Sequence, residues 1–205
     1  MSGSGYVRTI ALTPPALGNN TADAQRLEQA LKKEFTTGFV HIPRTLIADL
    51  PMRLRAWHWR VKVVLFKDRR SVVVVDLLDP EDAAPVLGAA VDIGTTRMVI
   101  SLLDLESGET IGETGLDNPQ ADIGPDVLTR IHHAGTPAGR DRLKRLAVSA
   151  VNDHLAQLCR DNQVTPDRVF LVAGAGNTAM THLFAGLPAF GRSEERRVGK
   201  ECATG

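Results

Sequence analysis

The chain has 205 residues, of which 43% are hydrophobic and 23% charged, as in an ordinary globular protein. Its 24 Lys and Arg balance its 24 Asp and Glu, so its charge gives no reason to expect nucleic acid or an anionic membrane as a partner. No apolar run approaches the ~20 residues of a membrane-spanning helix, and the start shows no apolar stretch typical of a signal peptide. We therefore expect a cytoplasmic protein.

The first part of the sequence predicts a small α+β domain over residues 1–85. Apolar side chains recur at helical spacing in two segments, although Pro51 should break or kink the second helix. Two β-branched segments follow, and the polar turn region around Lys67 between them indicates a hairpin. The expected elements are helices at residues 21–36 and 43–56 and strands at residues 59–65 and 71–77.

The second part, residues 86–190, mixes strands and helices and makes the whole chain α/β. Three strands in succession are expected to pair antiparallel, and a later segment with a period of 3.6 residues predicts a long helix. Residues 173–177 are expected to form a loop before the last helix. The expected elements are strands at residues 88–92, 97–104, 110–114 and 169–172 and helices at residues 125–133, 139–162 and 178–185.

The sequence VDIGTT, ending at Thr96, lies at the end of a predicted strand and is suited to binding a polyphosphate. Gly94 allows a tight turn with no Cβ in the way. Thr95 and Thr96 offer hydroxyl and N–H groups to phosphate oxygens, and Asp92 can hold Mg²⁺ through water. The alternative is an ordinary hairpin in which a buried Asp92 accepts N–H groups of the turn. The order of strands and helices after this motif favours phosphate binding.

A second candidate site is the turn Gly176, Asn177 and Thr178, which leads into a predicted helix. The first N–H groups of a helix have no internal partners and attract anions. The alternative is simple capping of the helix by Asn177 or Thr178. The sequence alone leaves both interpretations open.

The order of elements around DxGTT resembles the first lobe of the superfamily of acetate kinase, sugar kinases, heat-shock chaperones and actin, which has a ribonuclease-H-like fold. More narrowly, several stretches resemble the reductive activators of corrinoid proteins. They are residues 91–108, 118–131 and 176–186, together with residues 6–85, which resemble the middle domain of that family. The resemblance implies a linker domain over residues 1–85 and an incomplete first nucleotide-binding lobe over residues 86–190.

The resemblance implies ATP-driven transfer of one electron to an inactive cobalt(II) corrinoid on a partner, a corrinoid protein or corrinoid-dependent methyltransferase. It implies ATP at the two candidate sites with Mg²⁺ at Asp92, and pairing of two copies, as family members often do. A [2Fe–2S] domain delivers the electron in that family, but the two cysteines here, Cys159 and Cys202, do not fit its C-x₄-C-x₂-C spacing. We therefore expect the cluster elsewhere in the parent protein, and from this chain weak nucleotide binding without activation.

Two other functions share the same phosphate motif. One is a small-molecule kinase of the same superfamily, which needs a carboxylate base; Asp104 and Asp126 are available, but no pattern assigns either to that role. The other is a nucleotide-binding module without catalysis. The stretches 118–131 and 176–186 favour the corrinoid activator, and no catalytic residue is assigned.

Residues 192–202 read RSEERRVGKEC, which resembles a sequencing adapter translated in frame. The alternative is a charged, solvated tail. We expect residues 191–205 not to be native, the natural sequence to continue beyond Phe190, and Cys202 to have no role.

Overall fold

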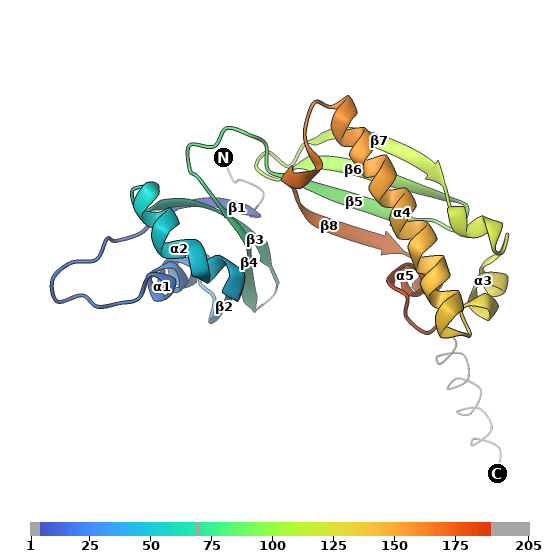
Figure 1. Ribbon diagram of the computed structural model, residues 1–205, viewed down its shortest axis with the longest axis horizontal. Helices are drawn as coiled ribbons and strands as arrows, with labels where there is room; N and C mark the ends of the chain where they lie inside the picture. The colour runs from blue at the N-terminus through green and yellow to red at the C-terminus, as the bar shows by residue number, and fades with distance from the viewer. Residues whose placement is uncertain (1–4, 69, 190–205) are drawn as a thin grey trace, which may run out of the picture. The chain divides into compact units, whose positions relative to one another are not determined.

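The computed structural model describes residues 5–68 and 70–189, and it is a mixed α/β structure with two four-stranded sheets (Figure 1). Two compact units are present. Of the described residues, those up to Gly88 form the first unit with the segments Asp104–Glu109 and Asp167–Leu171, and the others form the second. The adapter-like residues 191–205, Cys202 among them, lie outside the described residues. Within the described ranges, no helix is both long and apolar enough to cross a bilayer.

The first unit is built on a sheet with the strand order β1-β3-β4-β2. β3 (Arg60–Lys67) and β4 (Ser71–Leu78) form the predicted antiparallel hairpin. β1 (Val7–Ala11) pairs antiparallel with β3, and β2 (Phe39–His41) pairs parallel with β4. β1 and β2 were not predicted, because they are short strands at the two edges of the sheet.

Two helices, α1 (Asp23–Phe35) and α2 (Arg44–Ala56), cover one face of this sheet. They bury apolar residues against β3 and β4, and four of these residues are fully buried: Leu27, Leu31, Leu50 and Leu54. A break or kink was predicted at Pro51, and the break is wrong, because α2 runs unbroken through this residue. The buried leucines on either side of Pro51 explain this, because packing of the apolar face stabilises the helix against the proline.

The opposite face of β3 is covered by residues that come later in the chain. Val64 points to this side and packs with Val7, Val86 and Leu105, and all four are buried. Partly buried residues complete the cluster, namely Val75, Leu78, Phe170 and Leu171. The first unit therefore has apolar cover on both faces of its sheet.

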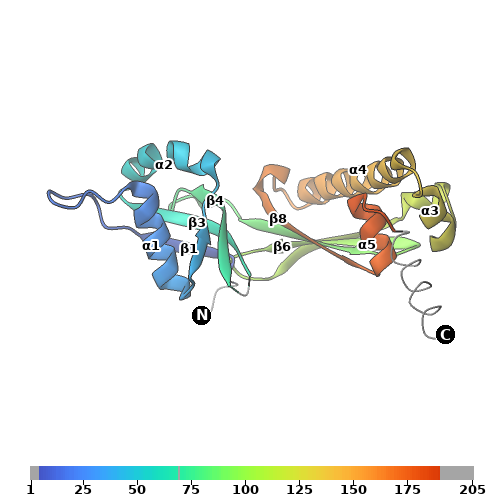
Figure 2. The ribbon, with the colours of Figure 1, turned by 90° about the horizontal axis from the view of Figure 1, so that it is seen from below.

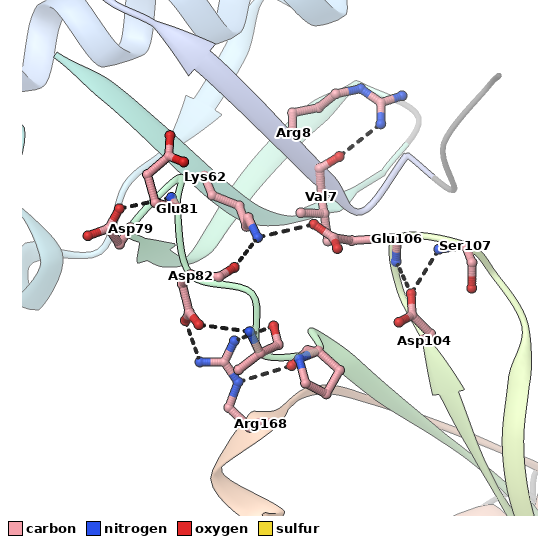
Figure 3. Close-up of polar contacts among 12 residues, drawn as sticks. Val7, Arg8, Lys62, Asp79, Glu81, Asp82, Asp104, Glu106, Ser107 and Arg168 are labelled. Carbon is pink, nitrogen blue, oxygen red and sulfur yellow. Dashed lines mark hydrogen bonds and ion pairs between the residues drawn. The ribbon is translucent and has the colours of Figure 1, made fainter. Parts of the chain in front are cut away.

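Polar contacts of Arg168 and Lys62 tie the same segments together (Figure 3). The Arg168 guanidinium donates to the Asp82 carboxylate at 2.9 Å and to the carbonyls of Ala84 and Pro85 at 2.9 and 3.0 Å. The Lys62 ammonium donates to the Asp82 carbonyl at 2.7 Å. The same ammonium lies 3.5 Å from a carboxylate oxygen of Glu106.

The second unit contains the sheet order β7-β6-β5-β8. β6 (Arg97–Asp104) and β7 (Thr110–Asp117) pair antiparallel, as predicted, and β5 (Leu87–Ile93) lies between β6 and β8 (Val169–Gly176). β8 extends through residues 173–176, most of the predicted loop, so that expectation was wrong. Gly174 lies against the side chain of Ile93, which allows this glycine-rich segment to continue as a strand.

Three helical segments lie between β7 and the short 3₁₀ turn η2 (Pro166–Arg168) that precedes β8, and a fourth follows β8. They are the 3₁₀ turn η1 (Pro119–Asp122), α3 (Val127–His133), α4 (Pro137–Asp161) and α5 (Thr178–Ala185). α4 lies across one face of the sheet, with α3 and α5 beside it (Figures 1 and 2). Its buried face includes Leu143, Ala147 and Val151, as the period of 3.6 residues predicted.

Candidate functional site

The candidate phosphate loop lies where β5 ends, between Ile93 and Arg97. Ile93 is buried, and the side chain of Asp92 is exposed, because successive residues of a strand point to opposite faces. The carboxylate of Asp92 is exposed and accepts no hydrogen bond from the described residues, so the alternative of a buried Asp92 that caps the turn does not apply. A Cβ at Gly94 would overlap the carbonyl oxygen of Arg97. This turn therefore requires glycine at that position.

Asn118 fixes two carbonyl groups of the loop from the protein interior. Its side-chain Nδ2 donates to the Gly94 carbonyl at 2.8 Å, and its backbone N–H donates to the Thr96 carbonyl at 2.8 Å. Its Oδ1 accepts the N–H of Gln120 and caps η1. Asn118 is only 1% exposed. Every polar group of its side chain therefore has a partner, as buried amides require.

Arg130 fixes the third carbonyl. It projects from α3 and is fully buried. Its Nη1 donates to the Thr95 carbonyl at 2.8 Å and contacts the Met180 sulfur at 3.9 Å, and its Nε donates to the Gly124 carbonyl at 2.7 Å. Its Nη2 is buried with no hydrogen-bond partner among the described residues. Burial lowers the pKa of Arg130 while Asp126 acts to raise it, and a guanidinium stays charged under such shifts.

These bonds determine where the N–H groups of the loop point. In a trans peptide the N–H points opposite to the C=O of the preceding residue. With the carbonyls of Gly94 and Thr95 bound to Asn118 and Arg130, the N–H groups of Thr95 and Thr96 are directed away from these two side chains. Successive backbone N–H groups that face one side form an anion-binding arrangement.

The second candidate segment lies next to the first. A Cβ at Gly176 would come within 2.8 Å of the Ile93 carbonyl oxygen, so the ends of β8 and β5 lie side by side. Asn177 caps α5, because its Oδ1 accepts the N–H of Met180 at 2.9 Å. Thr178 is the first residue of α5 and does not cap it. The structure thus brings residues 176–178 to the same end of the sheet as the phosphate loop, where β5 and β8 both end.

The two acids considered as a base for a kinase have local structural roles. Asp126 caps α3 by accepting the N–H of Thr129, and this bond, with the Thr129 hydroxyl, lowers the pKa of Asp126. Asp104 accepts the N–H groups of Glu106 and Ser107 in the turn after β6 (Figure 3).

The candidate metal ligands and the one described cysteine do not indicate a further site. Across the residues that the structure describes, no group of three or more His, Cys, Asp or Glu side chains could hold a metal ion. A single exposed carboxylate such as Asp92 still suits Mg²⁺, which keeps several waters. Cys159 is buried, and burial raises its thiol pKa, as expected for a packing residue.

Asn118 and Arg130 were not predicted as site residues. Both lie within the stretch 118–131, which carried the family resemblance but no assigned chemistry. The dipeptide formed by Asn118 and Pro119 indicates a turn, and Arg130 lies on a short helix. Neither local pattern reveals a contact with a loop more than twenty residues earlier.

Two family models cover most of the chain. The family described as the RACo middle region matches residues 87–193, and the family described as the RACo linker region matches residues 6–83. The first match alone exceeds half of the chain. The chain therefore belongs to the RACo family, the reductive activators of corrinoid proteins.

Two individual relatives agree with this assignment. The chain is 31% identical over 105 residues to the corrinoid activation enzyme RamQ of Eubacterium limosum, which is 51% of this chain and 18% of that protein. It is also similar to a solved structure of a reductive activator for corrinoid, iron-sulfur protein, with a TM-score of 0.77 and 31% identity over 87% of this chain and 28% of the other. The chain thus spans less than a third of either relative.

Proposed function

We propose that the chain is the linker domain and the first nucleotide-binding lobe of an ATP-dependent reductive activator. The division into residues 1–85 and 86–190 is part of this proposal, as is a ribonuclease-H-like fold for the second segment. One observation supports it above the others. The stretches that carried the family resemblance meet at the loop from Gly94 to Thr96, where Asn118 and Arg130 bind the carbonyls and Gly176 packs on Ile93.

The residues present fit a bound polyphosphate. The N–H groups of Thr95 and Thr96 face away from the interior, with the hydroxyls of the same residues available beside them. The exposed carboxylate of Asp92 holds Mg²⁺ through water, and the start of α5 at Thr178 adds N–H groups that favour anions. ATP supplies the free energy that drives the uphill electron transfer.

In the whole protein, the activity is the return of a cobalt(II) corrinoid protein to its active state by transfer of one electron. The partner is a corrinoid protein or a corrinoid-dependent methyltransferase, and the location is cytoplasmic. A [2Fe–2S] cluster needs four ligands, and this chain has two cysteines, so the cluster belongs to another part of the parent protein. Pairing of two copies is part of the same proposal.

Sequencing the source locus through both ends of the reading frame tests for the cluster domain and a second lobe.

Calorimetric titration of the chain with ATP, with and without Mg²⁺, tests the nucleotide site. We expect weak binding that Mg²⁺ strengthens, and we expect Asp92→Asn to remove the effect of Mg²⁺. Asp153→Asn is the matched control, because Asp153 is an exposed carboxylate in the middle of α4, and it should bind as the wild type does. The nucleotide site is refuted if the wild-type chain takes up no ATP, or if Asp92→Asn responds to Mg²⁺ unchanged.

A further inference from the structure

We infer that Asn118 and Arg130 are positioning residues that hold the phosphate loop in its anion-binding conformation. The inference rests on the proposed function, since it assigns two residues to the same nucleotide site. Neither residue is placed to touch the nucleotide; each acts through the backbone of Gly94, Thr95 and Thr96.

The contacts of Asn118 are those of a residue that fixes a backbone conformation. It is a buried amide whose Nδ2 and N–H bind the carbonyls of Gly94 and Thr96, the first and last residues of the loop. The remaining Oδ1 is bound to Gln120, so rotation of the amide would break bonds at both ends. Asn118 therefore anchors both ends of the loop to η1.

Arg130 adds a fixed positive charge beneath the middle of the loop. It is fully buried, no described carboxylate lies within ion-pair distance of it, and its Nη2 has no partner among the described residues. A buried cation without a paired anion costs free energy. Because Arg130 donates to the Thr95 carbonyl, it polarises the peptide whose N–H belongs to Thr96. A phosphate bound at that N–H would compensate the buried charge.

The same side chain also contacts α5. Its Nη1 lies 3.9 Å from the sulfur of Met180, which lies in the first turn of that helix. Gly124, whose carbonyl binds Nε, leads into α3. Arg130 therefore sets the position of both elements that face the phosphate, namely the loop after β5 and the start of α5.

Titration of ¹⁵N-labelled chain with magnesium pyrophosphate, followed by amide NMR spectra, tests this inference. In the wild type we expect saturable shifts at the Thr95 and Thr96 amides. Arg130→Lys keeps the charge but loses the planar fork that reaches two carbonyls. We expect it to weaken pyrophosphate binding about tenfold, the effect of losing one charge-assisted hydrogen bond.

Asn118→Ser is a second variant that preserves the fold more safely. A serine hydroxyl can still cap η1, but it offers no donor that replaces Nδ2 at Gly94. We expect weaker pyrophosphate binding and, even without ligand, faster hydrogen exchange at the backbone amide of position 118, which donates to the Thr96 carbonyl. Arg140→Lys is the control, because Arg140 also donates to a backbone carbonyl, that of Ala134, which is not part of the loop.

The outcomes separate this inference from the proposed function. If the wild-type Thr95 and Thr96 amides ignore pyrophosphate, the proposed nucleotide site itself fails. If the wild type binds, and Arg130→Lys and Asn118→Ser bind equally well, the nucleotide site stands and the positioning role is overturned. If both variants lose pyrophosphate binding while Arg140→Lys does not, the positioning role is supported.

Discussion

Gly176 lies so close to the backbone of Ile93 that a side chain there has no room. A Cβ would come within 2.8 Å of the Ile93 carbonyl oxygen, a backbone atom that cannot move alone. We expect Gly176→Ala to lower the free energy of unfolding by about 1–3 kcal/mol, the usual cost of overpacking. Urea unfolding measures this, with Gly38→Ala as the control, since a Cβ at Gly38 meets no atom within 4 Å. Equal stability of both variants would contradict the close approach of β8 to β5.

Asp82 makes the stability of the first unit depend on pH. The N–H of Ala84 is the main cause that lowers the pKa of the Asp82 carboxyl, and Arg168 adds to it. A lowered folded-state pKa means that the carboxylate stabilises the fold above the unfolded pKa, about 3.9. That contribution is lost as the pH falls through the lower folded value.

The test compares Asp82→Asn with the wild type in urea unfolding at several pH values. We expect the variant to be less stable by about 1 kcal/mol at neutral pH. The difference in stability between the variant and the wild type should shrink as the pH falls below the pKa of the carboxyl in the unfolded chain. Asp153→Asn, at an exposed position of α4, should show no such trend. A difference that stays constant with pH would show that Asp82 does not act through its charge.

At this scale, the sequence predicted the loop that we propose binds phosphate, and it missed the two residues that fix the backbone of this loop. Glycines and threonines after a strand indicate phosphate chemistry by their own properties, so Gly94 to Thr96 could be found locally. Asn118 and Arg130 act over 24 and 35 positions. Their roles depend on how η1 and α3 fold back on β5, which no local pattern encodes.

At the scale of elements, α2 shows where packing overrides local preference. Pro51 cannot donate to the carbonyl of Ile47, four residues earlier, and a proline inside a helix costs up to about 3 kcal/mol. Leu50 and Leu54 are fully buried on the same helix and keep it continuous. An interior proline favours a break in the helix, but the packing of the buried face of α2 outweighs this preference.

We therefore expect Pro51→Ala to stabilise the protein. Pro51 is exposed, so alanine fits without repacking, and the new N–H can donate to Ile47. The gain should be about 1–2 kcal/mol, because the more flexible unfolded chain offsets part of the helix term. Chemical unfolding measures it, and Met52→Ala, which is 70% exposed on the same helix, should change stability by less than about 0.5 kcal/mol. A loss of stability in Pro51→Ala would mean that the proline shapes α2 in a required way.

Most of the longer strands, unlike α2, follow the local preference of their residues, whereas β8 does not. β3, β4 and β6 have runs of β-branched or aliphatic residues that bury one or both faces, and their periodicity was sufficient to find them. β1 and β2 lie at sheet edges, and β2 is only three residues long. β8 ends in Ala-Gly-Ala-Gly, which has no strand preference of its own. It is a strand because its glycines fit against Ile93.

At the scale of the whole molecule, the first unit depends on residues far along the chain. Leu105 and Phe170 pack on the face of β3 that α1 and α2 leave open. Arg168 binds Asp82 across 86 positions of sequence. A boundary near residue 85, drawn from composition and patterning, assigns these residues to the other domain. Contacts at such separations could not be predicted without the fold.

Leu105→Ala tests this arrangement in the intact chain. Leu105 is 8% exposed and packs with Val7, Val64 and Val86. Truncation of a buried leucine costs about 2–5 kcal/mol, and we expect the lower end because the side chain is not fully enclosed. Native-state hydrogen exchange should show faster exchange at the amides of β1 and β3, although these strands lie some forty or more residues before the substitution.

The control is Leu17→Ala, whose side chain is fully exposed and should leave exchange unchanged. If Leu105→Ala accelerated exchange in β6 and β7 alone, the side chain of Leu105 would stabilise the sheet of the second unit and not that of the first. A response in β1 and β3 would instead mean that residues 6–83 draw part of their stability from segments after residue 100. The linker region would then be less stable without those segments, because one face of its sheet would be open to water.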